Sequence, residues 1–322
     1  MTELSFGSFA FTRLEADRRP DYAPGPIALL AMLLLQAAVW LDMLYLHVTF
    51  ENAWRPITGA GLPLALALYG QARRLNARFV AGCWMTGLFF SVIAFATALQ
   101  YLFAIHGGKN ELIDPVLLSL DHTLGLDPAA FTALCDRSAI LCNILLVIYS
   151  SLNLQLCLTV LALFTLRREQ TFEALIISMV FLIFIGATIA ACAPAIGFTG
   201  VSDVTFTHTT VGGGRFGQSN FLALRSGVMN TIDFDDTPGI ITFPSAHAAL
   251  GMLMTLVARS IRYAFWPVAM LNLIMLPGAV AHGGHYFVDL IGGIVICLAI
   301  WPLSLRLASW RPPSRRTERN FL

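Results

Sequence analysis

Long apolar runs, separated by short clusters of charged residues, dominate this chain of 322 residues. A helix of about 20 apolar residues crosses the hydrocarbon core of a bilayer, where every backbone polar group must be paired within the protein. The runs therefore predict transmembrane helices at residues 27–48, 57–71, 79–105, 139–165, 171–197, 243–258, 263–281 and 285–306. The expected fold class is all-α, a polytopic membrane helical bundle of about eight transmembrane helices.

The composition excludes a water-soluble fold. Only 12% of the residues are charged and 57% are apolar, whereas soluble domains carry roughly 25% charged residues. The six cysteines lie mostly inside the apolar runs, without the close spacing of a zinc site or a disulfide framework. We therefore interpret them as small buried hydrophobic residues.

The basic residues indicate how the bundle is oriented. Alternate segments between the predicted spans hold fifteen of the 20 Lys and Arg residues: Arg13, Arg18, Arg19, Arg73, Arg74, Arg78, Arg167, Arg168, Arg259, Arg262, Arg306, Arg311, Arg315, Arg316 and Arg319. The other segments hold five: Arg55, Lys109, Arg137, Arg215 and Arg225. Cytoplasmic segments are enriched in Lys and Arg, so this split places both termini in the cytoplasm.

A first motif stands where a long non-cytoplasmic segment enters the sixth predicted span. The run is Phe243-Pro244-Ser245-Ala246-His247, with Pro near a helix start and Ser and His in the first turn. The unpaired N–H groups of a helix N-terminus form a ready anion site. The alternative is a Pro-Ser helix cap followed by a histidine at the level of the lipid headgroups.

A second motif, His282-Gly283-Gly284-His285-Tyr286-Phe287-Val288-Asp289, opens the last predicted span. His285 and Asp289 are four residues apart, so on a helix they share one face and the carboxylate can fix the imidazole tautomer. An Asp inside the membrane costs about 2.5 to 3.5 kcal/mol and needs a partner. The alternatives are a structural His-Asp pair and a helix-capping Asp.

The predicted topology brings the two motifs to the same membrane face. It supplies one histidine backed by a carboxylate and one free histidine, which suits a two-step displacement with a nucleophile and a proton donor. Histidine, with a reference pKa of about 6.5, can perform either task.

These motifs resemble the type 2 phosphatidic acid phosphatase superfamily, most closely its branch with inositol phosphorylceramide synthase and the sphingomyelin synthases. The resemblance covers about residues 115–300; its weaker matches lie at 121–127, 194–197 and 224–227. It implies a six-helix core preceded by N-terminal helices, and metal-independent phosphoryl transfer through a phosphohistidine. His285 would attack phosphorus, Asp289 would orient it, and His247 would protonate the leaving oxygen.

The chain departs from the phosphatase branch at two motifs. A Lys-x6-Arg-Pro motif is missing between the spans, and Gly278-Ala279 stands where that branch carries Ser-Arg before the nucleophilic histidine. The phosphate therefore needs other donors, and we expect them among Arg225, Ser245, Arg215 and His282. A guanidinium suits phosphate oxygens; solvated loop arginines and a headgroup-level histidine are the alternatives. Both departures are also typical of the synthase-like branch.

Two further polar groups have open roles. Tyr149, Ser150 and Ser151 interrupt the fourth predicted span and either line the cavity or bond between helices. Asp121, His122 and Asp127 either contact an acceptor or belong to an interfacial element within 106–138.

The expected protein is an enzyme on phospholipids or lipid phosphates at the non-cytoplasmic face, such as the periplasmic side of a bacterial inner membrane. We predict a lipid phosphate phosphatase, with transfer of the phospho-headgroup to a lipid or polyol alcohol as the alternative. Rivals of other classes are a proton-coupled transporter and a zinc enzyme. We expect no cofactor, metal, nucleic acid or protein partner.

The expected organisation has four parts. They are a cytoplasmic segment at 1–26, N-terminal transmembrane helices at 27–105, a catalytic transmembrane domain at 106–306 and a basic cytoplasmic tail at 307–322.

Overall fold

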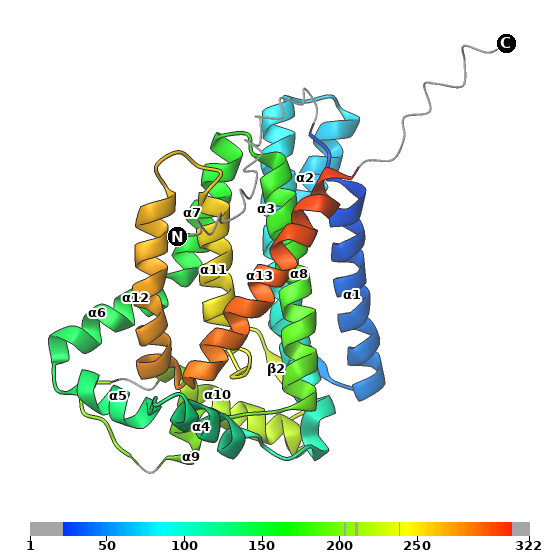
Figure 1. The fold of residues 1–322 in the computed structure, drawn as a ribbon. Helices are drawn as coiled ribbons and strands as arrows, with labels where there is room; N and C mark the ends of the chain where they lie inside the picture. The colour runs from blue at the N-terminus through cyan, green and yellow to red at the C-terminus, as the bar shows by residue number, and fades with distance from the viewer. Residues whose placement is uncertain (1–21, 203, 210–211, 238, 311–322) are drawn as a thin grey trace, which may run out of the picture.

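The computed structural model describes residues 22–202, 204–209, 212–237 and 239–310, without the side chains of 212–217 (Figure 1). An upright bundle contains α1 (Pro26–Leu46), α2 (Trp54–Ala72), α3 (Ala77–His106), α7 (Leu152–Thr165), α8 (Glu169–Cys192), α11 (Ala246–Ala258), α12 (Phe265–Gly283) and α13 (Phe287–Ser309). The slanted α6 (Ala139–Ser150) joins it from the side.

Shorter elements cover one end of the bundle. They are the 3-10 turn η1 (Gly107–Lys109), α4 (Asp114–Thr123), α5 (Pro128–Asp136), α9 (Phe198–Val201), α10 (Gly212–Arg225), and strands β1 (Thr49–Glu51) and β2 (Thr231–Asp233). The strands pair in parallel, with Phe50 opposite Ile232, and so join the loop after α1 to the loop before α11. We call this end of the bundle the capped end.

Each of the eight predicted spans forms helix. The fourth is broken at Ser151 into α6 and α7, and the sixth is short because α11 begins only after its N-cap Ser245. Among the described residues, α1, α3, α8, α12 and α13 are long and apolar enough to cross a membrane, while α7 and α11 are shorter apolar helices. A sixth crossing is added if α5 and α6, bent by 117°, count as one span. The prediction of a helical membrane bundle is confirmed.

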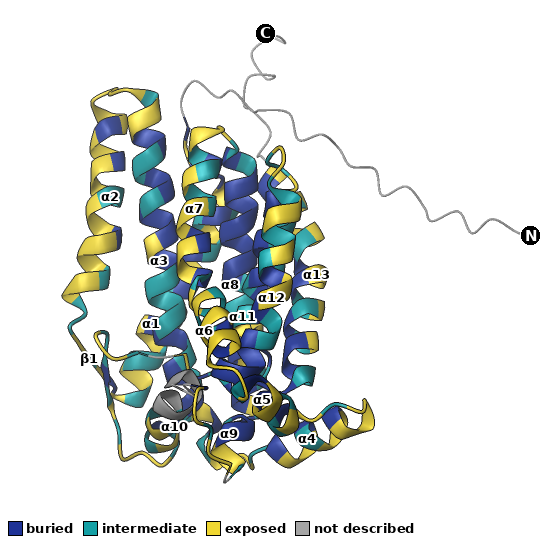
Figure 2. Cartoon of the chain, turned by 90° about the vertical axis from the view of Figure 1, so that its left-hand side faces the viewer, coloured by how far each residue is buried: buried dark blue, intermediate teal, exposed yellow. Residues whose placement is uncertain are grey.

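The outer surface of the bundle is apolar, as lipid requires. On α1, Leu33, Leu41 and Leu44 are each more than 60% exposed, and Figure 2 shows a long exposed stretch on α2. The centre is α8, where Phe172, Leu175 and Ile176 are fully buried. An exposed apolar surface of this extent is unfavourable in water but faces lipid at no such cost.

The start of α1 and the end of α13 lie at the end of the bundle opposite the capped end (Figure 1). The described chain thus enters and leaves the bundle at the same end, which corresponds to an even number of crossings. The long polar segments before α6 and before α11 therefore gather at one face, where the sequence placed both histidine motifs.

Candidate active site

His285 and Asp289 meet at the turn between α12 and α13. Gly284 ends α12 in the left-handed conformation, with φ of 71°, and Tyr286 is the N-cap of α13. Asp289 Oδ2 accepts the Tyr286 N–H at 2.8 Å and lies 3.3 Å from His285 Nδ1. His285 thus precedes the helix rather than sharing its face, and Asp289 reaches it by folding back over the helix N-terminus.

The carboxylate fixes the tautomer of His285. In its ionised state the Asp289 carboxylate only accepts hydrogen bonds, and in that state Nδ1 carries the proton and Nε2 keeps its lone pair. Nε2 lies 3.2 Å from Ser245 Oγ, whose hydroxyl donates to it. His285 therefore has the basic, oriented nitrogen that a nucleophile needs.

Ser245 joins the two motifs. It is fully buried, its Oγ accepts the Ala248 N–H at 3.4 Å, and its own N–H donates to the backbone oxygen of Asp289 at 3.0 Å. A Cβ at Gly293 would lie 2.3 Å from the Ser245 carbonyl oxygen. Only glycine allows this approach, which explains the glycine that follows the second motif on α13.

His247 lies in the first turn of α11 and faces His285. The two ring centroids are 6.5 Å apart, and the planes meet at 60°. The His247 ring also stacks on Tyr149 of α6, with centroids 4.2 Å apart and planes at 23°. The structure therefore brings together His285, Asp289, Ser245 and His247 as the sequence predicted.

Two buried aspartates of α4 support the turn that carries His285. Asp121 accepts the N–H groups of Phe287 at 2.8 Å and Val288 at 2.9 Å, and thus caps α13. Asp114 accepts the Gly197 N–H at 2.9 Å and the Tyr286 hydroxyl at 3.1 Å. Burial raises the pKa of both carboxyls above the usual value, and the N–H donors oppose that rise.

The sequence motifs left the role of Asp121 open and did not include Asp114. Asp114 does carry a signal, because Asp followed by Pro is common at a helix start. Its hydrogen-bond partners, however, belong to the segment after α8 and the turn before α13, so no local sequence pattern predicts them.

The Pro194-Ala195-Ile196-Gly197 run packs on the same turn. The Phe198 N–H donates to the Gly284 carbonyl at 3.1 Å, and a Cβ at Gly197 would lie 2.5 Å from that oxygen. Gly197 also has a φ of 84°, which disfavours other residues. The resemblance at residues 194–197 thus marks a segment that packs closely against the turn before His285.

The other predicted phosphate-binding residues lie differently. His282 is buried, and its Nε2 donates to the Cys142 carbonyl of α6 at 2.9 Å. The Arg225 guanidinium donates to the carbonyl oxygens of Gly107 and Asn110, tying α10 to the turn after α3. Arg215 belongs to α10, but its side chain is outside the described residues. Contacts of these three residues with phosphate stay predictions.

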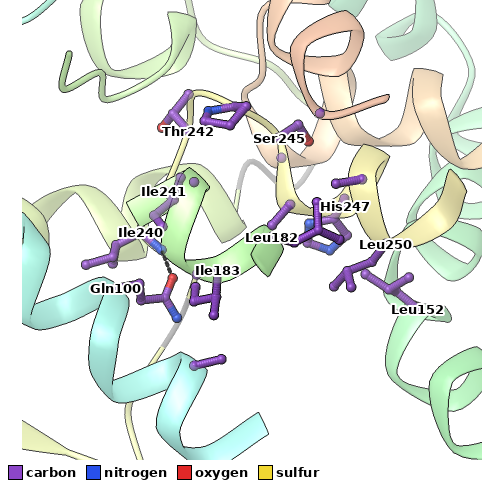
Figure 3. A pocket seen from close by; sticks show the side chains of 18 of the residues that line it. Gln100, Leu152, Leu182, Ile183, Ile240, Ile241, Thr242, Ser245, His247 and Leu250 are labelled. Carbon is purple, nitrogen blue, oxygen red and sulfur yellow. Dashed lines mark hydrogen bonds between the residues drawn. The ribbon is translucent and has the colours of Figure 1, made fainter. Parts of the chain in front are cut away.

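A cavity of about 420 Å³ adjoins the two histidines (Figure 3). Apolar side chains of α3, α7, α8 and α11 form most of its wall, and Figure 3 shows Gln100 on one side with His247 and Leu250 on the other. Its polar lining includes Thr97, Gln100, Asn153, Gln218, Thr237, Thr242 and Ser245. Among the described lining residues none is Lys, Arg, Asp or Glu.

The family comparison agrees with this arrangement. The PAP2 superfamily, the type 2 phosphatidic acid phosphatases, matches the chain over residues 115–303, which includes both histidine motifs and leaves α1 to α3 outside. The chain therefore belongs to the PAP2 superfamily, whose members are generally phosphatases or phosphotransferases. No curated protein and no solved structure gives a significant match to the chain. The inositol phosphorylceramide synthase-like branch stays a prediction.

Proposed function

We propose that this protein is a membrane enzyme that removes the phosphoryl group of a lipid phosphate through a phosphohistidine on His285. The arrangement that carries the proposal is the His285 ring, held at Nδ1 by Asp289 and lining the cavity beside the His247 ring. This is the geometry of an oriented nucleophile beside a separate proton donor.

The first step forms a bond between Nε2 and phosphorus. The bond from phosphorus to the lipid oxygen breaks, and a protonated His247 gives its proton to that oxygen. Positive charge develops on the His285 ring, where the Asp289 carboxylate stabilises it. The Ser245 hydroxyl, which bonds Nε2 in this structure, must turn away from it and can then donate to a phosphoryl oxygen.

The second step reverses these roles. His247, now neutral, takes a proton from water as the water oxygen attacks phosphorus. The phosphorus–nitrogen bond breaks, phosphate leaves, and His285 returns to its starting form. The free N–H groups in the first turn of α11 favour the phosphate charge throughout.

The cavity supports a lipid substrate. Its size is within the usual range of about 300 to 1,000 Å³ for small-molecule sites. Ile93 of α3, Leu182 of α8 and Leu250 of α11 are apolar residues that line the same cavity as the two histidines. The α3 wall lies outside the family match, so we expect it to adapt the site to this enzyme's own lipid.

Transfer to an alcohol is the second candidate, and the polar wall favours it. Gln100, Asn153 and Gln218 carry neutral amides, which recognise hydroxyl groups by hydrogen bonds and attract no ion. An alcohol bound there would take the place of water in the second step.

A panel of lipids tests the proposed function. Purified protein, incubated with phosphatidic acid and with phospholipids of several headgroups in excess chelator, should release inorganic phosphate from at least one lipid. New phospholipid products with an added alcohol would indicate transfer instead. Proton-coupled uptake into vesicles without either product would contradict the proposal and favour a transporter. The double variant His247→Ala with His285→Ala provides the blank.

The sidedness of the site is a separate prediction. Reporter fusions after Arg168 and after Arg316 should both report cytoplasm, and a fusion near Ser202 should report the opposite side. The reason is the distribution of basic residues. Ser202 directly follows α9, which lies at the capped end (Figure 1). Opposite signals from the first two fusions would refute this topology.

A further inference from the structure

Tyr149 lies beside both histidines, although the sequence motifs do not include it. It is close to the end of α6, its ring stacks on His247, and it lines the cavity. The stack fixes the plane of His247, whose ring centroid lies 6.5 Å from that of His285.

The position of Tyr149 depends on a departure from the phosphatase branch. At Gly278, where that branch carries the serine of its Ser-Arg pair, a Cβ would lie 2.9 Å from the Leu145 carbonyl oxygen and 3.1 Å from Tyr149 Cβ. Glycine at this position therefore lets α6 pack directly on α12.

The hydroxyl of Tyr149 lies near the His285 ring. A Cβ placed on Gly283 would lie 2.8 Å from Tyr149 Oη and 3.0 Å from His285 Cδ2. The hydroxyl and the imidazole ring therefore both lie next to Gly283. No residue in the described part of the chain accepts or donates a hydrogen bond to this hydroxyl. It is a free donor at the wall of the cavity.

The phosphoryl group of the proposed substrate is negatively charged, so a hydrogen-bond donor at this position would stabilise it. A phosphoryl group in this cavity meets no Lys or Arg among the described lining residues. Apart from a protonated His247, the described lining residues offer its oxygens only neutral donors, and a fixed donor stabilises charge more strongly in a low-dielectric site than in water. Ser245 and the N-terminus of α11 supply donors on one side, and Tyr149 supplies one on the side of α6.

We propose that Tyr149 is a catalytic residue, whose hydroxyl donates a hydrogen bond to a non-bridging phosphoryl oxygen while its ring holds His247 in place. The inference rests on the proposed function. No bond to Tyr149 forms or breaks, and it keeps its proton through both steps.

The variant Tyr149→Phe tests the hydroxyl, because phenylalanine keeps the stacked ring. Loss of one such donor costs roughly 100-fold or more in turnover, and we expect a loss of this order with little change in KM. The rate of phosphoenzyme formation should fall equally for donors with good and poor leaving groups, since the non-bridging oxygens gain charge in both. Tyr69→Phe, exposed on α2, is the matched control and should behave as wild type.

A binding measurement separates this inference from the proposed function. Vanadate, a phosphate analogue, should bind the wild-type protein and bind Tyr149→Phe about tenfold more weakly, as expected for one lost hydrogen bond. Equal vanadate affinity and wild-type turnover in Tyr149→Phe would overturn the role of Tyr149 and leave the proposed function intact. Wild-type protein that neither binds vanadate nor forms a phosphoenzyme would overturn both.

Discussion

His285→Ala should form no covalent phosphoenzyme and should lose turnover by roughly 10⁴-fold or more, the usual scale for removal of a nucleophile. The reason is that Nε2 of His285 is the basic nitrogen with its tautomer fixed from the other side of the ring. Rapid quenching of a reaction with labelled lipid phosphate, followed by mass spectrometry, should find acid-labile phosphate on His285 of the wild-type protein.

Asp289→Asn provides the graded control for this result. Asparagine keeps the shape of the side chain but loses the charge that stabilises the imidazolium, so its turnover should fall between wild type and His285→Ala. Phosphate trapped on His247 instead of His285 would reverse the two roles. The location of the site would still stand, because both rings belong to it.

His247→Ala should slow phosphoenzyme formation from a lipid donor by about 100-fold to 10⁴-fold, the usual contribution of a general acid. A donor that releases p-nitrophenol needs no proton on its leaving oxygen. Phosphoenzyme formation from that donor should therefore recover in His247→Ala, whereas it should stay absent in His285→Ala.

The stack with Tyr149 calls for a second variant at this position. Alanine removes the ring on which Tyr149 packs, while His247→Phe keeps a ring and removes only the proton donor. Recovery with the p-nitrophenyl donor should appear in both variants. Equal slowing with both donors in His247→Phe would show that His247 does not protonate the leaving oxygen.

Local patterns predicted the helices and the two motifs. A run such as Pro26–Leu46 is apolar on every side, so its partition into lipid is fixed residue by residue and requires no knowledge of its neighbours. The break at Ser151 was predicted only as a polar interruption, because the direction that a helix takes after a break depends on what it packs against.

The pairing of His285 with Asp289 was also predictable from the sequence, because four residues span little more than one helical turn. The manner of pairing was not: His285 stands before α13, and its partner returns to it through the N-terminus of that helix. The sequence analysis named Ser245 as a phosphate donor, and the structure adds that it bonds both His285 and the backbone at Asp289.

The sequence by itself therefore predicted the spans, a common face for the two motifs and candidate residues for phosphoryl transfer, since hydropathy and short spacings are local properties. Only the tertiary structure decided which donors face the cavity. In the structure, Arg225 and His282 donate hydrogen bonds to backbone carbonyl oxygens. Tyr149 stacks on His247. Asp114 and Asp121 of α4 accept hydrogen bonds from the turn that follows His285. The physical reason is that each of these side chains has its partner on a helix or loop distant in sequence, and helix packing alone brings such partners together.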